Sequence, residues 1–314
     1  MGRSGAIGID VGGTKCLGVA LDDSGSVVAE HRVATPDGAE PVLEAIAGVA
    51  MALGCGPGDT VGLGMPGLVD AAGALAFAAN LPGVFDLPVR AALERRLPGV
   101  RVTVDNDANC AAWAEHRLGA AKGSAHVVLA TLGTGIGGGV ITEGRLVRGA
   151  HGFGGEIGHM VVDPHGPVCP CGQRGCWERF ASGDALGRMG REAASAGGAA
   201  ALVELASGDP QAVRGEHVTA AAAAGDGDAL ELAGHFAWWL ALGLANLANL
   251  LDPARFVIGG GLVEAGDLLL APARDAFSQL LQGSGHRPEV PIVPAVMGEH
   301  AGAVGAALLG TANP

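Results

Sequence analysis

The sequence predicts an α/β protein of two related lobes with a cleft between them, and three observations support this. The chain has 314 residues, enough for two α/β lobes or for one large domain. Short apolar runs typical of strands alternate with longer segments of helical spacing. Two successive blocks, beginning near residues 5 and 125, each open with a strand, a glycine-rich turn and a returning strand. This weak duplication favours two lobes of similar construction.

In the first block, apolar runs bounded by glycine, aspartate or proline predict strands, and apolar residues at helical spacing predict helices. Glycines in residues 12–14 and 22–25 indicate the tight turns that join the first three strands. The predicted strands cover residues 5–10, 15–21, 26–33, 60–64 and 100–104, and the predicted helices cover residues 39–53, 86–97 and 108–118.

The second block repeats the pattern and contains one very apolar segment, residues 232–251. This segment is long enough to span a membrane, but it includes His235, Asn246 and Asn249, and no basic flank follows it. We therefore expect a buried helix. The predicted strands cover residues 125–132, 140–142, 255–258 and 290–293, and the predicted helices lie near residues 182–193, 198–206, 227–251, 268–281 and 300–309.

Charge and cysteine usage narrow the class of protein. The formal net charge is −13, which argues against partners such as nucleic acid or an anionic membrane. Of six cysteines, three form one C-x-C-x4-C cluster and the others are scattered. The first residues, Met-Gly-Arg-Ser, do not resemble a secretory signal. Reduced thiols and a cytoplasmic location are therefore expected.

The densest group of ligands lies between Glu156 and Glu178. His159, Cys169, Cys171 and Cys176 make a complete four-coordinate zinc set with carboxylates on both sides. The alternative is a structural zinc knuckle remote from any ligand. A redox pair fits less well, because C-x-C is not the C-x-x-C spacing.

Two glycine turns are candidate phosphate sites. Asp10, Gly12, Gly13 and Thr14 lie on a strand–turn–strand, which excludes a dinucleotide-binding fingerprint, and no Gly-Lys-Ser/Thr of a P-loop follows. Glycines let backbone N–H groups face an anion, Thr14 adds a hydroxyl, and Asp10 could hold Mg²⁺ through water. Lys15 either touches phosphate or is a surface lysine. The alternative for the whole motif is an ordinary glycine hairpin.

A second turn of the same kind contains Gly133, Thr134 and Gly135. One such turn from each lobe would suit a polyphosphate tail. Gly260 and Gly261, which follow a predicted strand, lack side chains and would permit close approach of a nucleotide base or sugar.

Together these motifs resemble the ROK family of sugar kinases and related repressors, and its bacterial glucokinases are the most similar members. The resemblance implies an actin-like, hexokinase-like (ribonuclease H-like) ATPase fold, with residues 1–118 and 297–314 in a small N-terminal lobe and residues 119–296 in a large lobe carrying the zinc loop. The matching segments are residues 7–14, 64–67, 80–83, 105–109, 132–139, 156–178 and 259–261.

The resemblance also implies an activity, the ATP-dependent phosphorylation of glucose at its 6-hydroxyl with Mg²⁺, a structural Zn²⁺ and Asp107 as general base. The alternative role for Asp107 is capping of the helix that follows it. One ring nitrogen of His159 would bind zinc and the other would donate to the sugar. The residues expected to contact the sugar are Gly67, Asn80, Asn106, Asp107, Glu156, His159 and Glu178.

Several alternatives remain. The acceptor could be N-acetylglucosamine, N-acetylmannosamine or mannose, and inorganic polyphosphate could replace ATP. A sugar-responsive repressor fits less well, since the first predicted strand begins near residue 5 with no basic helix pair before it. The family also suggests a homodimer or homotetramer.

Overall fold

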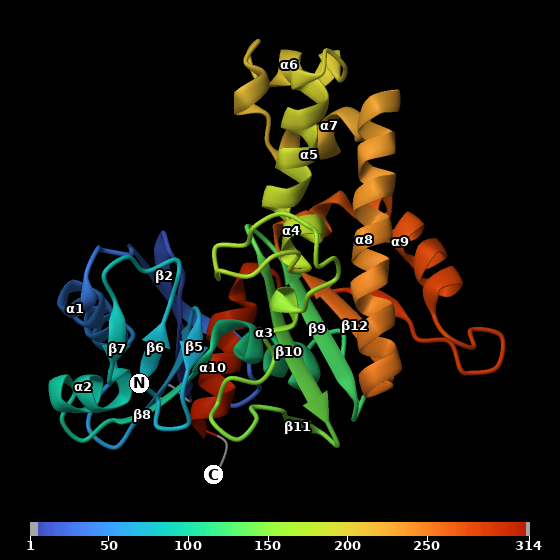
Figure 1. The fold of residues 1–314 in the computed structure, drawn as a ribbon. Coiled ribbons are helices and arrows are strands. Elements are labelled where there is room, and N and C mark those ends of the chain that lie inside the picture. Colours follow the sequence, from blue (N-terminus) through green and yellow to red (C-terminus); the bar gives the residue numbers. More distant parts are fainter. Residues whose placement is uncertain (1–5, 312–314) are drawn as a thin grey trace. The chain divides into compact units, whose positions relative to one another are not determined.

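The structure, a computed structural model, describes residues 6–311 (Figure 1). These residues form two compact units. The first unit comprises the chain up to Leu129, then Gly138–Gly155, and the chain from Val296 on; the second comprises Ala130–Gly137 and Glu156–Ala295. These boundaries differ from the expected lobe boundaries, because residues 119–129 and 138–155 belong to the first unit.

The first unit is built on a five-stranded sheet of order β3-β2-β1-β4-β8. β1, β2 and β3 form antiparallel pairs, whereas β4 and β8 run parallel to β1. The strands predicted here are confirmed to within three residues at each end. They are β1 (Ala6–Val11), β2 (Lys15–Leu21), β3 (Val27–Ala34), β4 (Thr60–Met65) and β8 (Arg101–Asn106).

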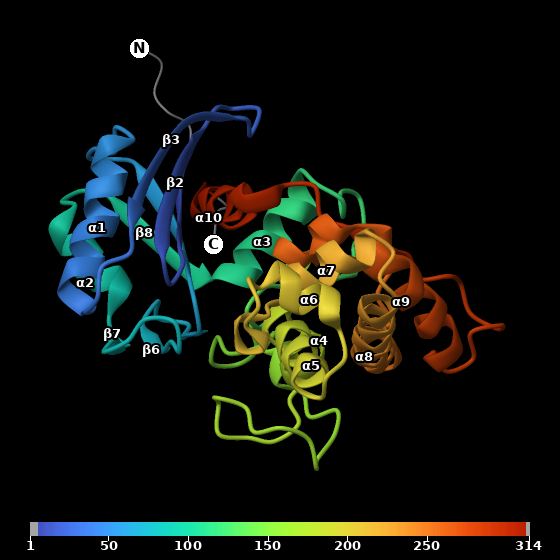
Figure 2. The same cartoon turned by 90° about the horizontal axis from the view of Figure 1, so that it is seen from above.

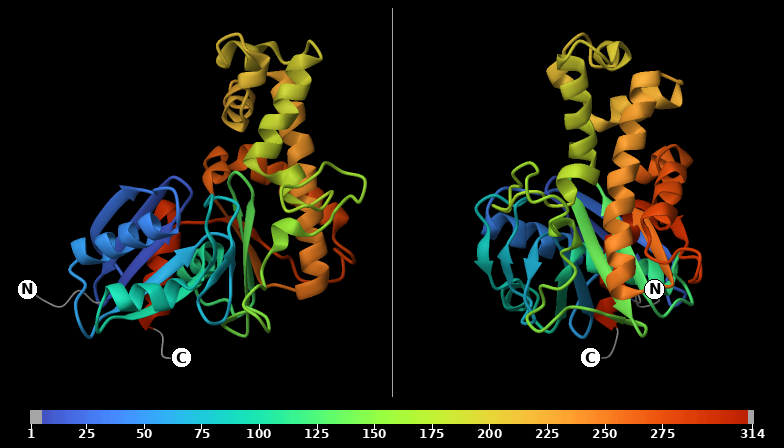
Figure 3. Two further views of the ribbon diagram at one scale, coloured as in Figure 1. Left: turned by 60° about the vertical axis from the view of Figure 1, so that its left-hand side comes forward. Right: turned by 45° about the vertical axis from the view of Figure 1, so that its right-hand side comes forward.

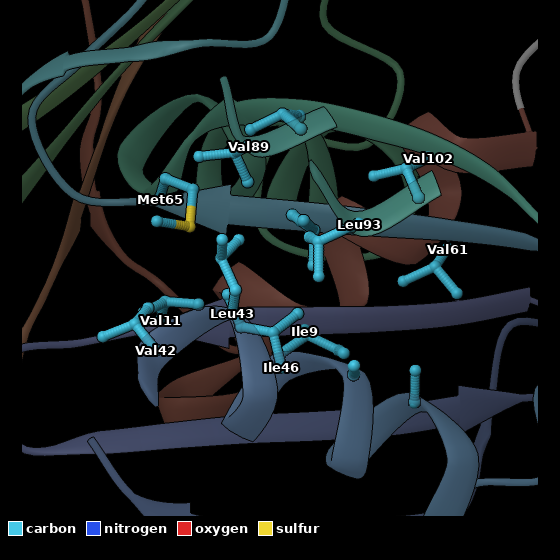
Figure 4. Close-up of a cluster of buried hydrophobic side chains, with 14 of the residues drawn as sticks. Ile9, Val11, Val42, Leu43, Ile46, Val61, Met65, Val89, Leu93 and Val102 are labelled. Atoms are coloured by element: carbon cyan, nitrogen blue, oxygen red, sulfur yellow. The ribbon is translucent and has the colours of Figure 1, made fainter. Parts of the chain in front are cut away.

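Side chains alternate across this sheet, so each face carries its own helices. Ile9 and Val11 point toward α1 (Ala39–Ala52) and α2 (Val89–Arg96), where they join a cluster of buried apolar side chains (Figure 4). The opposite face carries α3 (Asp107–Arg117) and α10 (Ala301–Thr311) (Figure 2). A Cβ atom on Gly8 would lie 2.0 Å from the carbonyl oxygen of Ala303, so the absence of a side chain lets α10 lie directly on β1.

The predicted helix 86–97 is wrong in its first turn, because Phe85–Leu87 is a strand, β7. The helix begins at Val89 with Pro88 as its N-cap, and a residue before proline is disfavoured in helical conformation. β7 pairs with β6 (Leu75–Phe77), which pairs with β5 (Leu68–Val69) in a small antiparallel sheet that the sequence analysis did not predict.

The second five-stranded sheet has the order β11-β10-β9-β12-β13, which matches the order of the first. The repeated order is what the weak internal duplication predicts. β10 begins at Ile136, so the later glycines of the run 133–139 lie in a strand rather than in the predicted turn. The strands are β9 (Val127–Leu132), β10 (Ile136–Thr142), β11 (Arg145–Leu146), β12 (Arg255–Gly259) and β13 (Ile292–Pro294).

The longest helix of the second unit is α8 (Gly227–Leu251), and its predicted span is confirmed. Its N-cap is Asp226, whose Oδ1 accepts the Ala229 N–H at 2.9 Å. The yellow-green helix α5 and the golden helix α7 pack beside orange α8 (Figure 3). α7 was not predicted from the sequence. The remaining helices are α4 (Glu178–Ala181), α5 (Gly183–Ser195), α6 (Ala200–Leu205), α7 (Gly215–Ala223) and α9 (Asp267–Leu280).

Short 3₁₀ turns occur at Ile157–His159, Pro210–Ala212, Gly261–Ala265 and Gly298–His300. Across residues 6–311, no helix combines the length and the apolar character needed to cross a membrane. α8 is buried along one side only, since Trp238 and Leu250 are exposed, so the expected buried helix is confirmed in part.

Candidate active site

In the first unit, the sheet brings Asp10 close to Asp107, two predicted site residues. Asp10 lies beside Gly64, and Gly64 lies beside Asp105 in the register of β1, β4 and β8. A Cβ atom on Gly64 would lie 3.3 Å from Asp10 Oδ1 and 3.4 Å from Asp107 Cα. The glycine therefore leaves room between the Asp10 carboxylate and the start of α3, at the carboxyl ends of parallel strands, where α/β proteins commonly bind ligands.

The electrostatics of this corner favour a cation. The pKa of Asp10 is raised to about 7, mainly by burial and in addition by the negative charge of Asp107, while Lys15 opposes the shift. An acid that resists ionisation beside a second carboxylate is stabilised as an anion by a bound cation. Hard oxygen donors of this kind fit Mg²⁺ that keeps part of its water shell.

Asn106, and not Asp107, is the N-cap of α3. Asn106 Oδ1 accepts the N–H groups of Ala108 (2.9 Å) and Asn109 (3.1 Å), while its Nδ2 donates to Gly67 O (3.1 Å). Asn106 therefore holds the N-cap position, although Asp107 Oδ1 also accepts the Ala108 N–H at 2.8 Å. Asp107 occupies the first helical position, where the helix dipole stabilises an anion.

The first glycine turn packs against the loop that carries Asn80. A Cβ atom on Gly13 would lie 3.0 Å from Asn80 O. The N–H of Gly12 donates to Lys15 O at 2.8 Å, so this amide closes the hairpin and cannot also face an anion. Lys15 Nζ pairs with Glu299 at 2.7 Å, as expected for a surface lysine.

In the second unit, the four predicted metal ligands converge. One donor atom from each of His159, Cys169, Cys171 and Cys176 lies within 4.8 Å of all the others. Cys171 Sγ lies 3.6 Å from Cys176 Sγ, and Cys169 Sγ lies 3.7 Å from His159 Nδ1. A tetrahedron with metal–sulfur bonds of about 2.3 Å has edges of about 3.8 Å, so these separations fit zinc. We call these four residues the metal set.

The orientation of His159 suits the dual role expected of it. Its Nδ1 faces the metal set, whereas Nε2 lies 3.9 Å from Glu156 Oε2. On the other side, Glu178 Oε1 accepts the Cys169 thiol at 3.0 Å and lies 3.8 Å from His159 Nδ1. Burial raises the pKa of Glu156 and the charge of Glu178 adds to the shift, while His159 lowers it. Glu156, His159 and Glu178 thus form one polar group around the metal set.

The second glycine turn adjoins this group. A Cβ atom on Gly135 would lie 2.5 Å from Glu178 Oε2, so only glycine leaves room for that carboxylate. Gly133 O accepts the N–H of Gly183 at 2.7 Å, which joins the turn to the start of α5. Gly260 has a φ of +83°, and a Cβ there would lie 2.4 Å from Leu132 O.

A cavity of about 810 Å³ opens on the far side of this turn. Gly133, Thr134 and Gly261, all predicted site residues, line it together with residues of α5 and α7. The α7 residues were missed because α7 was not predicted, and the α5 residues were missed because the helix was predicted without a binding role. The sequence signal was three glycines, Gly183, Gly187 and Gly215, which pack closely in the structure. The polar side chains of the lining are Thr134, Asp184, Arg191, Arg214, Glu216, Thr219 and Glu264.

Comparisons with known proteins agree with this arrangement. A family profile described as ROK family matches residues 6–313. A glucokinase of Streptomyces coelicolor is 40% identical over 305 residues, covering 96% of each chain. An N-acetyl-D-glucosamine kinase of Vibrio cholerae is 34% identical and covers 96% of this chain and 98% of its own. The crystal structure of a ROK family glucokinase from Streptomyces griseus in complex with glucose and AMPPNP superimposes with a TM-score of 0.86 at 40% identity, covering 97% of this chain and 98% of that one.

Proposed function

The chain belongs to the ROK family, and on that premise we propose that it transfers the γ-phosphoryl group of ATP to the 6-hydroxyl of glucose. The observation that carries this proposal is the position of Glu178. Its carboxylate contacts the metal set through Cys169 and the second glycine turn through Gly135. A polar acceptor group and a donor cavity therefore adjoin within one unit.

The donor half of the proposal rests on the cavity and the turn. A volume of about 810 Å³ suits a nucleotide. Gly133 and Thr134 line the cavity, and the next residue of the turn, Gly135, approaches Glu178, so the terminal phosphates would lie along this turn. Gly261 leaves space for the base or ribose, since a Cβ there would meet no atom within 4 Å.

The acceptor half rests on paired donors and acceptors. Carboxylates and amides match vicinal hydroxyls, which both donate and accept. The proposed sugar contacts are Glu156, His159 Nε2 and Glu178 of the second unit, and Asn80 and Asn106 of the first. Asn106 has one Nδ2 hydrogen left for this purpose after capping α3 and donating to Gly67 O.

Asp107 would accept the proton of the attacking hydroxyl. Phosphoryl transfer requires mainly positioning and neutralisation of charge, so a carboxylate of low basicity is sufficient when the hydroxyl loses its proton late. Mg²⁺ near Asp10 would neutralise the phosphates. Zn²⁺ in the metal set would brace the loop that carries His159 and, since all four positions are filled by protein, would leave no site for catalytic water.

Replacement of Asp107 tests the mechanism. Asp107→Asn preserves the size of the side chain and leaves the Asn106 cap in place. We expect glucose binding by calorimetry to change little while kcat falls by a factor of about 10² to 10⁴. Asp23→Asn, on an exposed turn, is the matched control. Turnover close to that of the unaltered protein would remove Asp107 from the mechanism.

The choice of acceptor and donor needs a separate experiment. Glucose, mannose, N-acetylglucosamine and N-acetylmannosamine are offered in turn with ATP, and glucose is also offered with polyphosphate. We expect the highest kcat/KM for glucose with ATP. Turnover of only an N-acetylated sugar would assign the chain to the second specificity, for which the Vibrio cholerae relative is the precedent.

A further inference from the structure

An ion pair between buried Asp105 and the partly exposed Arg148 lies in the first unit, next to the proposed general base, and has no part in the mechanism above. Asp105 is only 6% exposed. Its Oδ2 accepts a hydrogen bond from Arg148 Nε at 2.7 Å and lies 2.7 Å from Arg148 Nη2, so two guanidinium nitrogens contact the same carboxylate oxygen. Its Oδ1 accepts the N–H of Asn106 and Nδ2 of Asn109, both at 2.9 Å. One carboxylate thus ties together the end of β8, the first turn of α3 and Arg148.

Arg148 opens a tight loop, residues 148–155, that ends one residue before Glu156. Arg148 O accepts the N–H of Gly154 at 2.9 Å, and His151 O accepts the N–H of Ala71 at 3.1 Å. Gly155 has a φ of +104°, which favours glycine. The loop is therefore held at its start by Arg148 and at its middle by the segment after β5.

Asn109 holds the other end of this loop. It is 1% exposed, and a Cβ atom on Gly155 would lie 3.6 Å from Asn109 Oδ1 and 3.1 Å from Gly138 O. Within residues 6–311, Oδ1 of Asn109 has no hydrogen-bond partner. A side chain at 155 would be crowded by Gly138 O and would contact Asn109 Oδ1, so Asn109 lies next to the end of the loop at Gly155.

Charge strengthens the case for Arg148. Burial raises the pKa of the Cys110 thiol well above its usual range, the charges of Asp105, Asp10 and Asp107 raise it further, and Arg148 opposes them. Arg148 is thus the cation that acts on the Cys110 thiol against three carboxylates, and it contacts Asp105 directly. Without it, Asp105 would keep a buried negative charge that its two hydrogen-bond donors only partly compensate.

We propose that Arg148, Asp105 and Asn109 are positioning residues for the sugar, because they fix loop 148–155 against the first turn of α3 and so fix the point from which Glu156 extends. The inference rests on the proposed function, in which Glu156 contacts the sugar and Asn106 and Asp107 begin α3. The three residues touch neither sugar nor phosphate. Their loss should therefore weaken recognition of the acceptor while leaving the donor cavity unchanged.

The test is a split between Michaelis constants in the full-length protein. For Arg148→Met we expect the KM for glucose to rise by about 10-fold or more, since small misplacements of binding groups have effects of this size, and the KM for ATP to stay within about 2-fold of its original value. Arg148→Lys keeps the charge but not the planar pair of donors, so its glucose KM should lie between those of the unaltered protein and Arg148→Met. Arg145→Met, at an exposed arginine of β11, is the matched control and should leave both constants unchanged.

A double-mutant cycle separates positioning from general damage. Asp105→Asn should raise the glucose KM as Arg148→Met does. The double variant should be no worse than the more affected single one, because both remove the same ion pair. Three results would overturn the proposal. The rises in glucose KM of the two single variants could multiply in the double variant, the glucose KM of Arg148→Met could stay within 2-fold of normal, or the Michaelis constants for glucose and ATP could rise equally. If Arg148→Met does not fold, Arg148→Lys and Asp105→Asn decide by the same criteria.

The outcomes also separate this proposal from the proposed function. If the unaltered protein phosphorylates none of the sugars offered, both the proposed function and the positioning role are refuted. If it phosphorylates a sugar and Arg148→Met has the same Michaelis constants, only the positioning role is refuted.

Discussion

The strongest steric prediction concerns Gly243 in the middle of α8. A Cβ atom there would lie 2.0 Å from Cε2 of Trp177 and 2.4 Å from its Cδ2 and Nε1. Trp177 is fully buried, and its Nε1 donates to Trp239 O at 2.8 Å. The indole ring therefore occupies the space of the missing side chain and cannot withdraw without losing this hydrogen bond.

The effect of Gly243→Ala is the sum of opposing contributions. Alanine in a helix interior gains about 1 kcal/mol over glycine. Overpacking of a well-filled core costs about 1 to 3 kcal/mol, and a buried indole N–H without its acceptor costs about 1 to 3 kcal/mol more. We expect a net loss of about 3 kcal/mol in the free energy of unfolding.

Gly234→Ala in the same helix is the matched control. Gly234 is exposed, and a Cβ there would meet no atom within 4 Å. This variant should gain about 0.5 to 1 kcal/mol from its helix propensity alone. Urea unfolding, followed by far-UV circular dichroism, measures the free energy of unfolding of both variants. Relative to the unaltered protein, we expect a decrease for Gly243→Ala and an increase for Gly234→Ala.

The same substitution should affect function. Trp177 lies between Cys176 of the metal set and Glu178, so displacement of its ring should lower bound zinc and raise the glucose KM. If Gly243→Ala were as stable as Gly234→Ala, the packing of Trp177 against α8 would not have the rigidity inferred here.

Substitutions at three further residues test other groups. The pKa of Asp10 is raised from 3.8 to about 7, mainly by burial. Since an unfolded chain ionises at the lower value, the free energy of unfolding should fall as pH rises through this window. Asp10→Asn should therefore be more stable than the unaltered protein at pH 8, by at most about 4 kcal/mol, but not below pH 4, in urea titrations with a magnesium chelator. Glu115 is fully buried and accepts the N–H groups of Ala120, Val296 and Met297, so Glu115→Ala should lose about 3 kcal/mol or more while Glu115→Gln loses less; equal losses would contradict the hydrogen-bond explanation. Cys171→Ser should lower the zinc content found by elemental analysis, with Cys55→Ser as the control, and intact metal in Cys171→Ser would contradict the proposed ligand set.

Local patterns allowed the prediction of those elements that local interactions determine. The span of α8 follows from the Asp226 cap and a long apolar periodicity, and the metal set follows from ligand spacing. The small β5–β7 sheet has strands of two or three residues, too short for an alternation to be recognised. The start of α2 was set by Pro88, whose effect on the preceding residue a helical pattern does not reveal.

The site was predicted in part for a related reason. Asp10, Asp107 and the metal set carry recognisable motifs. The ion pair of Asp105 and Arg148 joins residues 43 positions apart, and although Asp105 lies in a matching segment, nothing in that segment points to Arg148. The ion-pair partner of Lys15, Glu299, lies 284 positions away, so the glycine motif could not reveal it. Contacts between residues that only tertiary folding brings together could not be predicted from local sequence patterns.

The packing of α10 on β1 and β4 has a consequence for how the protein is made. A Cβ atom on Gly62 would lie 1.7 Å from Ala306 O, so the face of the sheet is shaped to receive this one helix. During translation, however, the strands leave the ribosome more than two hundred residues before α10 is synthesised. Until then their glycine-lined face is uncovered. We therefore expect the first unit to complete its folding only after α10 is synthesised, or a chaperone to cover the sheet until then. A chain released before α10 is made would expose an aggregation-prone sheet surface.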